Sequence, residues 1–210
     1  MNIKNSICLL LLSVALLCSC NGGETAKTIL QRGEKSPKVV HVYYFKGFDE
    51  RLGRKTIERL HATFDSVVYE GTLPYPDSAY YAPRHRYKAD KLAKHLRAVH
   101  GPSSDLIIAF SPKDISAEVH GYDDYGVLGW TRCHQHASIV STYRIRDKSR
   151  LDEDFIKLVL HEMGHADGLP HCQHSTTCYL RDAKGKYHLP ELDGFCSDCK
   201  TYLEKKGWHL

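Results

Sequence analysis

The first apolar segment of the chain that is typical of a strand is Val39–Phe45, which is rich in β-branched and aromatic residues. Leu52, Ile57, Leu60 and Phe64 follow at helical spacing, which predicts a helix directly after that strand. A second strand is expected over Phe64–Leu73, centred on Val67-Val68-Tyr69. The chain after its polar start therefore begins as a strand, a helix and a strand.

The middle of the chain continues this alternation. A helical stripe of Leu92, Leu96 and Val99 predicts a helix over Tyr87–His100, ended by Gly101-Pro102. The apolar run Leu106–Phe110 predicts a strand buried on both faces. Before the helix, the tyrosine-rich and proline-rich loop Pro74–Tyr87 either lines a groove or packs its tyrosines on the core; packing is the favoured interpretation.

Two further strands are predicted over Tyr125–Trp130 and Ala137–Tyr143. Ser149 and Asp152 then form a pattern similar to a capping box, so a helix is expected to begin there, with Leu151, Phe155, Leu158, Val159 and Ala166 on its buried side. Strands that alternate with helices predict an α/β fold: a single compact domain with a twisted, mixed, mostly parallel sheet.

The N-terminal residues have the pattern of an export signal. A positive start at Lys4 precedes the short apolar run Ile7–Leu17, and Leu17-Cys18-Ser19-Cys20 resembles a bacterial lipobox. We expect a lipoprotein signal peptide over 1–19, lipidation of Cys20, a flexible tether over 20–38 and the folded domain over 39–210. The protein would then be exported and anchored to a bacterial membrane, on its periplasmic or cell-surface side. Ordinary secretory cleavage and an uncleaved anchor are the alternatives.

Charge and cysteine content narrow the function classes. A formal net charge of +4 without a lysine or arginine run gives no nucleic-acid surface, so no nucleic-acid partner is expected. Fourteen histidines fit metal chemistry. Without Cys8, Cys18 and Cys20, an odd number of cysteines remains, which argues against a framework made only of disulfides. Cys133, His134 and His136 lie between two predicted strands. A metal site there is conceivable, but isolated residues at a strand connection more often pack on the core or face solvent.

The most informative segment runs from His161 to Cys172 and reads HEMGHADGLPHC. His161 and His165 are four residues apart, so both imidazoles lie on one face of a helix. Gly168 allows the helix to end in a left-handed conformation, and His171 follows the turn as a third nitrogen ligand. Three protein ligands with an open position are typical of a catalytic zinc, and Glu162 is placed to reach its water. The pattern is that of the metzincin metallopeptidases.

A second group of candidate ligands follows at once. Cys172, Cys178, Cys196 and Cys199 can close a tetrahedral zinc site with no open position, which would make that zinc structural. Because Cys172 is adjacent to His171, such a site would also fix the third histidine. Two disulfides are the alternative in an oxidising compartment. The Cys-x-x-Cys pair favours metal.

The histidine motif and the four cysteines together resemble the archaemetzincins. The resemblance covers residues 161–199 and implies a metzincin-like metalloprotease domain with two zinc ions. It implies a catalytic zinc on His161, His165 and His171, and a structural zinc on the four cysteines. Two departures stand out: the first two cysteines are separated by five residues instead of four, and Leu180 occupies the position of the methionine beneath the catalytic metal.

These residues lead to an expected activity. The protein is expected to be a zinc metallopeptidase, in which Glu162 acts as general base on a zinc-activated water and the substrate is a peptide or protein. The segment Gly126–Trp130 is a candidate edge for strand-like peptide binding. A non-catalytic zinc-binding surface lipoprotein and a zinc hydrolase of a non-peptide amide remain alternatives. A monomer is expected.

Overall fold

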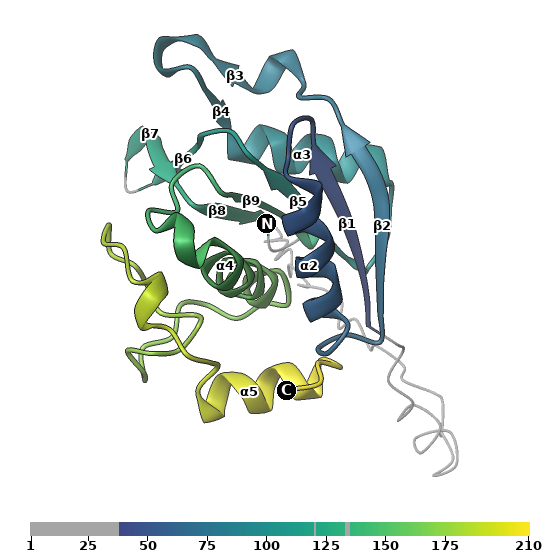
Figure 1. Ribbon diagram of the computed structural model, residues 1–210, viewed down its shortest axis with the longest axis vertical. Coiled ribbons are helices and arrows are strands. Elements are labelled where there is room, and N and C mark those ends of the chain that lie inside the picture. Colours follow the sequence, from purple (N-terminus) through teal and green to yellow (C-terminus); the bar gives the residue numbers. More distant parts are fainter. Residues whose placement is uncertain (1–37, 120, 133–134) are drawn as a thin grey trace, which may run out of the picture. The chain divides into compact units, whose positions relative to one another are not determined.

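The computed structural model describes residues 38–119, 121–132 and 135–210. The predicted signal peptide, the lipidation site Cys20 and almost all of the predicted tether lie outside them. The described chain forms two sheets and four α-helices (Figure 1). The helices are α2 (Glu50–Leu60), α3 (Ala89–His100), α4 (Leu151–Ala166) and α5 (Ser197–Lys205). None of these helices is long and apolar enough to cross a bilayer.

The larger sheet has five strands in the order β2-β1-β5-β9-β8. Parallel pairing joins β2, β1, β5 and β9, and only β8 runs antiparallel to its neighbour. The expected mixed, mostly parallel α/β sheet is confirmed. Its strands are β1 (Val39–Phe45), β2 (Ser66–Leu73), β5 (Leu106–Ser111), β8 (Gly129–Arg132) and β9 (Ala137–Ser141).

Helices cover both faces of this sheet. The side chains of Val40, Val42 and Tyr44 pack with α2 and α4, whereas Tyr43 and Phe45 belong to the core beneath α3. Figure 1 shows α2 and α4 on the near face and α3 on the far one. All residues of β5 are buried, which confirms the expectation for Leu106–Phe110. Apolar side chains therefore pack on both faces of the sheet and hold its strands in place.

The second sheet differs from the sequence-based expectation. It contains β3 (Tyr80–Tyr81), β4 (Arg86–Lys88), β6 (Ile115–Val119) and β7 (Tyr122–Val127), in the order β3-β4-β6-β7. The predicted loop Pro74–Tyr87 therefore contains strand residues, and β6 was not predicted. The tyrosines of the segment Pro74–Tyr87 do pack on the core, as favoured from the sequence: Tyr75 stacks on Phe45 and Tyr87.

The predicted strand Tyr125–Trp130 is wrong as a single element. It is divided between β7, which pairs with β6, and β8, which pairs with β9 in the other sheet. Each half has its own ladder of main-chain hydrogen bonds, so both are paired despite the break. The main-chain amide of Ser141 donates to Leu128 O at the break between them.

The start of α4 also differs from the prediction. The capping-box expectation at Ser149 is wrong, because Lys148–Arg150 forms a 3₁₀ turn and the helix begins at Leu151. The Asp147 carboxylate accepts a hydrogen bond from the Ser149 main-chain N–H in place of a Ser149 cap. Other helix and strand ends shift by a few residues, as fraying ends commonly do.

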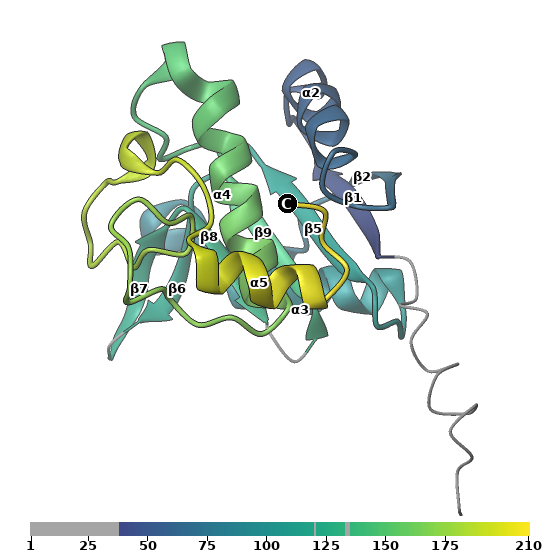
Figure 2. The same ribbon diagram turned by 90° about the horizontal axis from the view of Figure 1, so that it is seen from below.

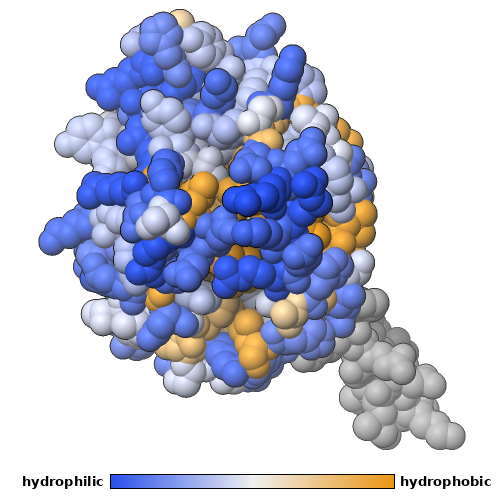
Figure 3. Space-filling model, in the orientation of Figure 1, coloured by the Kyte–Doolittle hydropathy of each residue, from blue (hydrophilic) through white to orange (hydrophobic). Residues whose placement is uncertain are grey.

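Helix α5 closes the domain beside the C-terminal end of α4 (Figure 2). Leu203 and Trp208 are buried in the same core as Met163 and Ala166 of α4. The side of α2 that points away from the sheet faces solvent and exposes mainly charged residues. Figure 3 shows this face as largely hydrophilic, with small separate apolar patches.

Candidate metal centres and active site

The C-terminal half of α4 presents two histidines on one face. Four residues separate His161 and His165, and their Nε2 atoms lie 3.1 Å apart. The two rings meet edge to face, with centroids 4.6 Å apart. The predicted placement on one helical face is confirmed.

Both rings are oriented by backbone carbonyls. The Nδ1 of His161 is 2.6 Å from Tyr179 O, and the Nδ1 of His165 is 2.7 Å from Leu169 O. A carbonyl oxygen only accepts, so each Nδ1 carries the proton and each Nε2 keeps its lone pair. Metal-binding histidines are held in this way in proteins.

The third histidine arrives through the turn predicted at Gly168. That glycine has φ +100°, and the amide of Leu169 donates back to Gly164 O. The His171 ring centroid then lies 5.5 Å from that of His161 and 4.7 Å from that of His165. One nitrogen from each of the three rings lies within 4.8 Å of the others.

The protonation of these rings suits a metal. Burial, together with the neighbouring His165, lowers the pKa of His161 to about 3. Burial also lowers the pKa of His171. Neutral imidazoles with free lone pairs are the ligands that zinc prefers. Across the described residues, no carboxylate or thiol joins this group as a fourth ligand.

Glu162 is held beside these histidines by strand β8. Its side chain is buried, and the Thr131 hydroxyl donates to Oε2 at 2.5 Å. Gly129 leaves the space that the carboxylate occupies, since a Cβ there would overlap Oε1. Burial raises the pKa of Glu162, whereas His165 and the Thr131 hydroxyl oppose that rise. Neither Thr131 nor Gly129 was predicted as a site residue. Gly129 lies within the candidate edge Gly126–Trp130, and Thr131 directly follows that edge.

The four predicted cysteines converge. One sulfur from each of Cys172, Cys178, Cys196 and Cys199 lies within 4.8 Å of the others. The Sγ atoms of Cys172 and Cys196 are 3.6 Å apart, too far for a disulfide bond, and all four thiols are free. A tetrahedral zinc with bonds of about 2.3 Å holds its sulfurs at a similar separation.

Main-chain amides support the cysteine sulfurs. The N–H of His174 points to Cys172 Sγ at 3.4 Å, and the N–H of Cys196 points to Cys178 Sγ at 3.5 Å. Short bridges join Cys172 to Arg181 and Cys178 to Gly194. These contacts accommodate the five-residue spacing between the first two cysteines, so the sulfurs meet despite the longer loop.

Leu180 lies between the two sites. It is fully buried, and its carbonyl accepts from the amide of Cys172 at 2.7 Å. A Cβ on Gly164, which lies between the histidines of α4, would be only 3.0 Å from the Leu180 Cδ2 atom. The leucine therefore forms an apolar floor under the metal-site helix, where the archaemetzincin pattern has methionine.

Asp167 was missed as a support residue. Its carboxylate is buried and accepts hydrogen bonds from Lys38 Nζ and Trp208 Nε1, and its carbonyl accepts from the Tyr202 hydroxyl. The two ends of the folded domain are thereby joined to the turn after His165.

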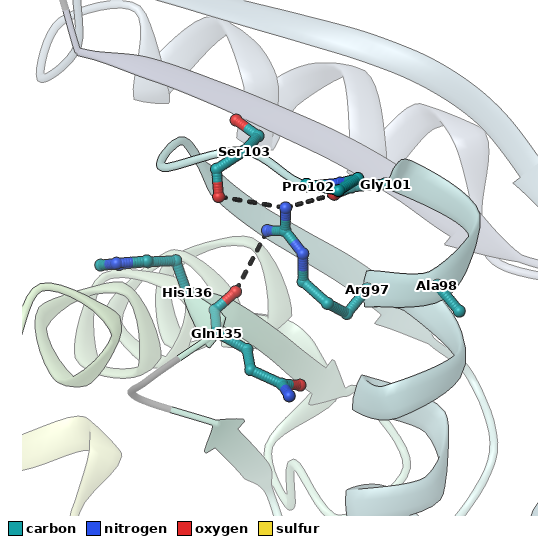
Figure 4. A pocket seen from close by; sticks show the side chains of 7 residues that line it. All are labelled: Arg97, Ala98, Gly101, Pro102, Ser103, Gln135 and His136. Atoms are coloured by element: carbon teal, nitrogen blue, oxygen red, sulfur yellow. Dashed lines mark hydrogen bonds between the residues drawn. The ribbon is translucent and has the colours of Figure 1, made fainter.

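A separate pocket opens at the end of α3 (Figure 4). The Arg97 guanidinium in this pocket donates hydrogen bonds to the main-chain carbonyls of Gly101, Ser103 and Gln135. His136 lines this pocket, whereas Cys133 and His134 lie outside the described residues. The pocket lies on the α3 side of the sheet, away from the three histidines.

Sequence comparisons agree with the geometry. A profile of Peptidase family M54 matches residues 68–205, which is more than half of the chain. Archaemetzincin from Nanoarchaeum equitans is 27% identical over 169 residues, covering 80% of this chain and 91% of that protein. Archaemetzincin from Saccharolobus solfataricus is 29% identical over 153 residues, covering 69% of this chain and 80% of that protein.

Solved structures share the fold. The crystal structure of archaemetzincin from Methanopyrus kandleri has a TM-score of 0.70 at 22% identity, covering 82% of this chain and 97% of that one. The archaemetzincin from Archaeoglobus fulgidus, complexed with malonate, has a TM-score of 0.66 at 20% identity, covering 78% and 99%. On the profile match over residues 68–205, the chain belongs to Peptidase family M54 and is a zinc metallopeptidase.

Proposed function

We propose that this zinc metallopeptidase hydrolyses peptide bonds with Glu162 as the general base. The observation that carries the proposal is the buried Glu162 carboxylate, which Thr131 fixes on the helix that carries two of the three converging imidazoles. Zinc held by His161, His165 and His171 would supply Lewis acidity, lowering the pKa of a bound water and polarising the scissile carbonyl.

The protein's own groups then handle the proton. Glu162 accepts a proton from the attacking water as the new C–O bond forms, and delivers it to the amine nitrogen as the C–N bond breaks. The Thr131 hydroxyl holds Oε2, which leaves Oε1 for this transfer.

The substrate is proposed to bind as an added strand along β8. This strand pairs with β9 on one side and is the last strand of the five-stranded sheet. An extended peptide can form main-chain hydrogen bonds with such an edge. Because Gly129 contacts Glu162, a peptide on this edge lies beside the carboxylate.

The second part of the proposal is a structural zinc on the four cysteines. The mutual approach of their sulfurs and the N–H contacts to two of them support it. Its mechanical role is to hold Cys172 and, through the adjacent peptide, His171. The protein would therefore bind two zinc ions.

The Glu162→Gln variant tests the catalytic proposal. We expect zinc content to stay unchanged while peptide hydrolysis falls by at least about 100-fold. Glu153→Gln, at an exposed position of the same helix, is the matched control and should keep full activity. Unchanged hydrolysis by Glu162→Gln would remove the glutamate from the mechanism. If the protein hydrolysed non-peptide amides in preference to peptides, the proposed substrate class would be wrong.

The cellular context is also a proposal. We propose an exported protein anchored to a bacterial membrane through lipid on Cys20, supported by the Leu17–Cys20 pattern. Metabolic labelling with a clickable fatty acid should mark the wild-type protein and not the Cys20→Ala variant. Equal labelling of both proteins, or of neither, would contradict the anchor.

A further inference from the structure

The guanidinium of Arg144 fills the space that a side chain on Gly126 would occupy. Gly126 lies just before β8, the strand along which the substrate is proposed to bind. A Cβ at Gly126 would overlap the Nη2, Cζ and Nε atoms of Arg144. Gly129 has the same relationship with the carboxylate of Glu162. An arginine and the proposed general base thus lie against two glycines of one short segment.

The two groups lie on the same side of that segment. Val127 and Trp130 pack against the core beneath α3, whereas Thr131 contacts Glu162 of α4. Neighbouring residues of a strand point to opposite faces, so Gly126 points away from the α3 core, as Gly129 does. Their Cα atoms are three residues apart, at most about 11 Å.

Arg144 is fixed but retains a free donor. Its Nε and Nη2 donate to the two oxygens of Asp114, at 2.6 and 2.9 Å. Its side chain is 35% exposed, and its Nη1 has no partner within the described part of the chain. An arginine clamped in this way loses little conformational entropy when it binds a second anion.

The surrounding ion pairs leave positive charge at this point. Asp114 is shared between Arg144 and Arg86, and Asp124 is within ion-pair distance of cations on β4 and the turn before it. The cations of this network outnumber its carboxylates; they are Arg84, Arg86, Lys88 and Arg144 against Asp114 and Asp124. An anion bound at Arg144 would neutralise part of this excess positive charge.

We propose that Arg144 is a specificity residue that binds a carboxylate of the peptide substrate, within about three residues of the cleaved bond. The carboxylate belongs either to an acidic side chain or to the peptide C-terminus. The proposal rests on the proposed peptidase function and adds the chemistry of one substrate position.

The test compares matched peptides that place Glu or Gln at each position near the cleaved bond, with a free or an amidated C-terminus. We expect wild-type kcat/KM to be at least about tenfold higher for one acidic peptide than for its neutral partner, the usual size of one charged hydrogen bond. Arg144→Gln should reduce that ratio to about one and leave the neutral peptides unchanged. The side-chain and C-terminal series identify the source of the carboxylate.

Two controls separate this proposal from the peptidase mechanism. Arg54→Gln removes an exposed arginine whose one ion pair, among the residues that the structure describes, is with Glu50; the preference should survive this change. Binding of the same peptides to the Glu162→Gln protein, measured by fluorescence anisotropy, should show the acidic preference without any cleavage. If no peptide is cleaved but this binding preference depends on Arg144, the mechanism fails and the subsite stands. Equal binding of acidic and neutral peptides, or a preference that persists in Arg144→Gln, would overturn the subsite.

Discussion

The indole Nε1 of Trp208 donates a hydrogen bond to the carboxylate of Asp167, two residues after the candidate metal ligand His165. Residues near the C-terminus thereby hold the turn that supplies Leu169 O to His165. We expect Trp208→Phe to lower the free energy of unfolding by about 2 kcal/mol, because a buried carboxylate loses one donor. Urea unfolding of the two proteins measures this difference.

Phenylalanine keeps most of the packing of Trp208 on Phe64, so the polar contact is the main loss. The nearby His209→Ala change removes an exposed ion pair with Asp65 and should leave stability nearly unchanged. A Trp208→Phe protein as stable as wild type would show that Lys38 alone suffices for Asp167.

Gly129 is predicted to be essential for the position of Glu162. A methyl group at this residue would overlap the Glu162 carboxylate, so Gly129→Ala should displace that side chain. We expect peptide hydrolysis to fall by at least about tenfold with zinc content unchanged. Gly194→Ala, where the structure leaves open space, is the control. Full activity of Gly129→Ala would mean that the carboxylate works from another position.

Leu180 is predicted to tolerate methionine but not alanine. Leucine and methionine have similar volumes, so Leu180→Met should cost less than about 1.5 kcal/mol. Leu180→Ala would open a cavity between Gly164 and the cysteines and should cost about 2–5 kcal/mol. Thermal unfolding with zinc present ranks the three proteins. Equal stability of Leu180→Ala would exclude the apolar floor as a support.

The Asp124 network predicts a pH effect on stability. Burial alone would raise the pKa of the Asp124 carboxyl, but Ser116, Lys88 and Arg86 together hold it below its ordinary value. A depressed pKa means that the stabilisation is complete above the unfolded-state pKa of about 4 and is lost as pH falls through the lower, folded-state pKa. Below pH 4, stability should therefore fall more steeply in wild type than in Asp124→Asn. Parallel curves would contradict this assignment.

The convergence of the candidate metal ligands could be predicted because it depends on local chain geometry. The i, i+4 spacing of His161 and His165, and the glycine that turns the chain toward His171, determine the geometry within about ten residues. The buried strand β5 was predictable for the same reason, since an uninterrupted apolar run needs no knowledge of its partners.

The supporting residues depend on contacts between distant segments. Thr131 meets Glu162 and Trp208 meets Asp167 only after the sheet and α5 are in place. The division of the predicted Tyr125–Trp130 strand has a similar cause, since its two halves pair with different sheets. No periodicity in a single strand reveals which neighbour it will have.

The zinc content of the folded domain, measured by mass spectrometry of the metal after exhaustive dialysis, tests the central claim most directly. We expect two zinc ions per wild-type chain and one in a variant with His161, His165 and His171 changed to alanine, because the cysteine site remains. Zinc content that is the same in the wild type and the triple variant would contradict the claim that these imidazoles hold a metal.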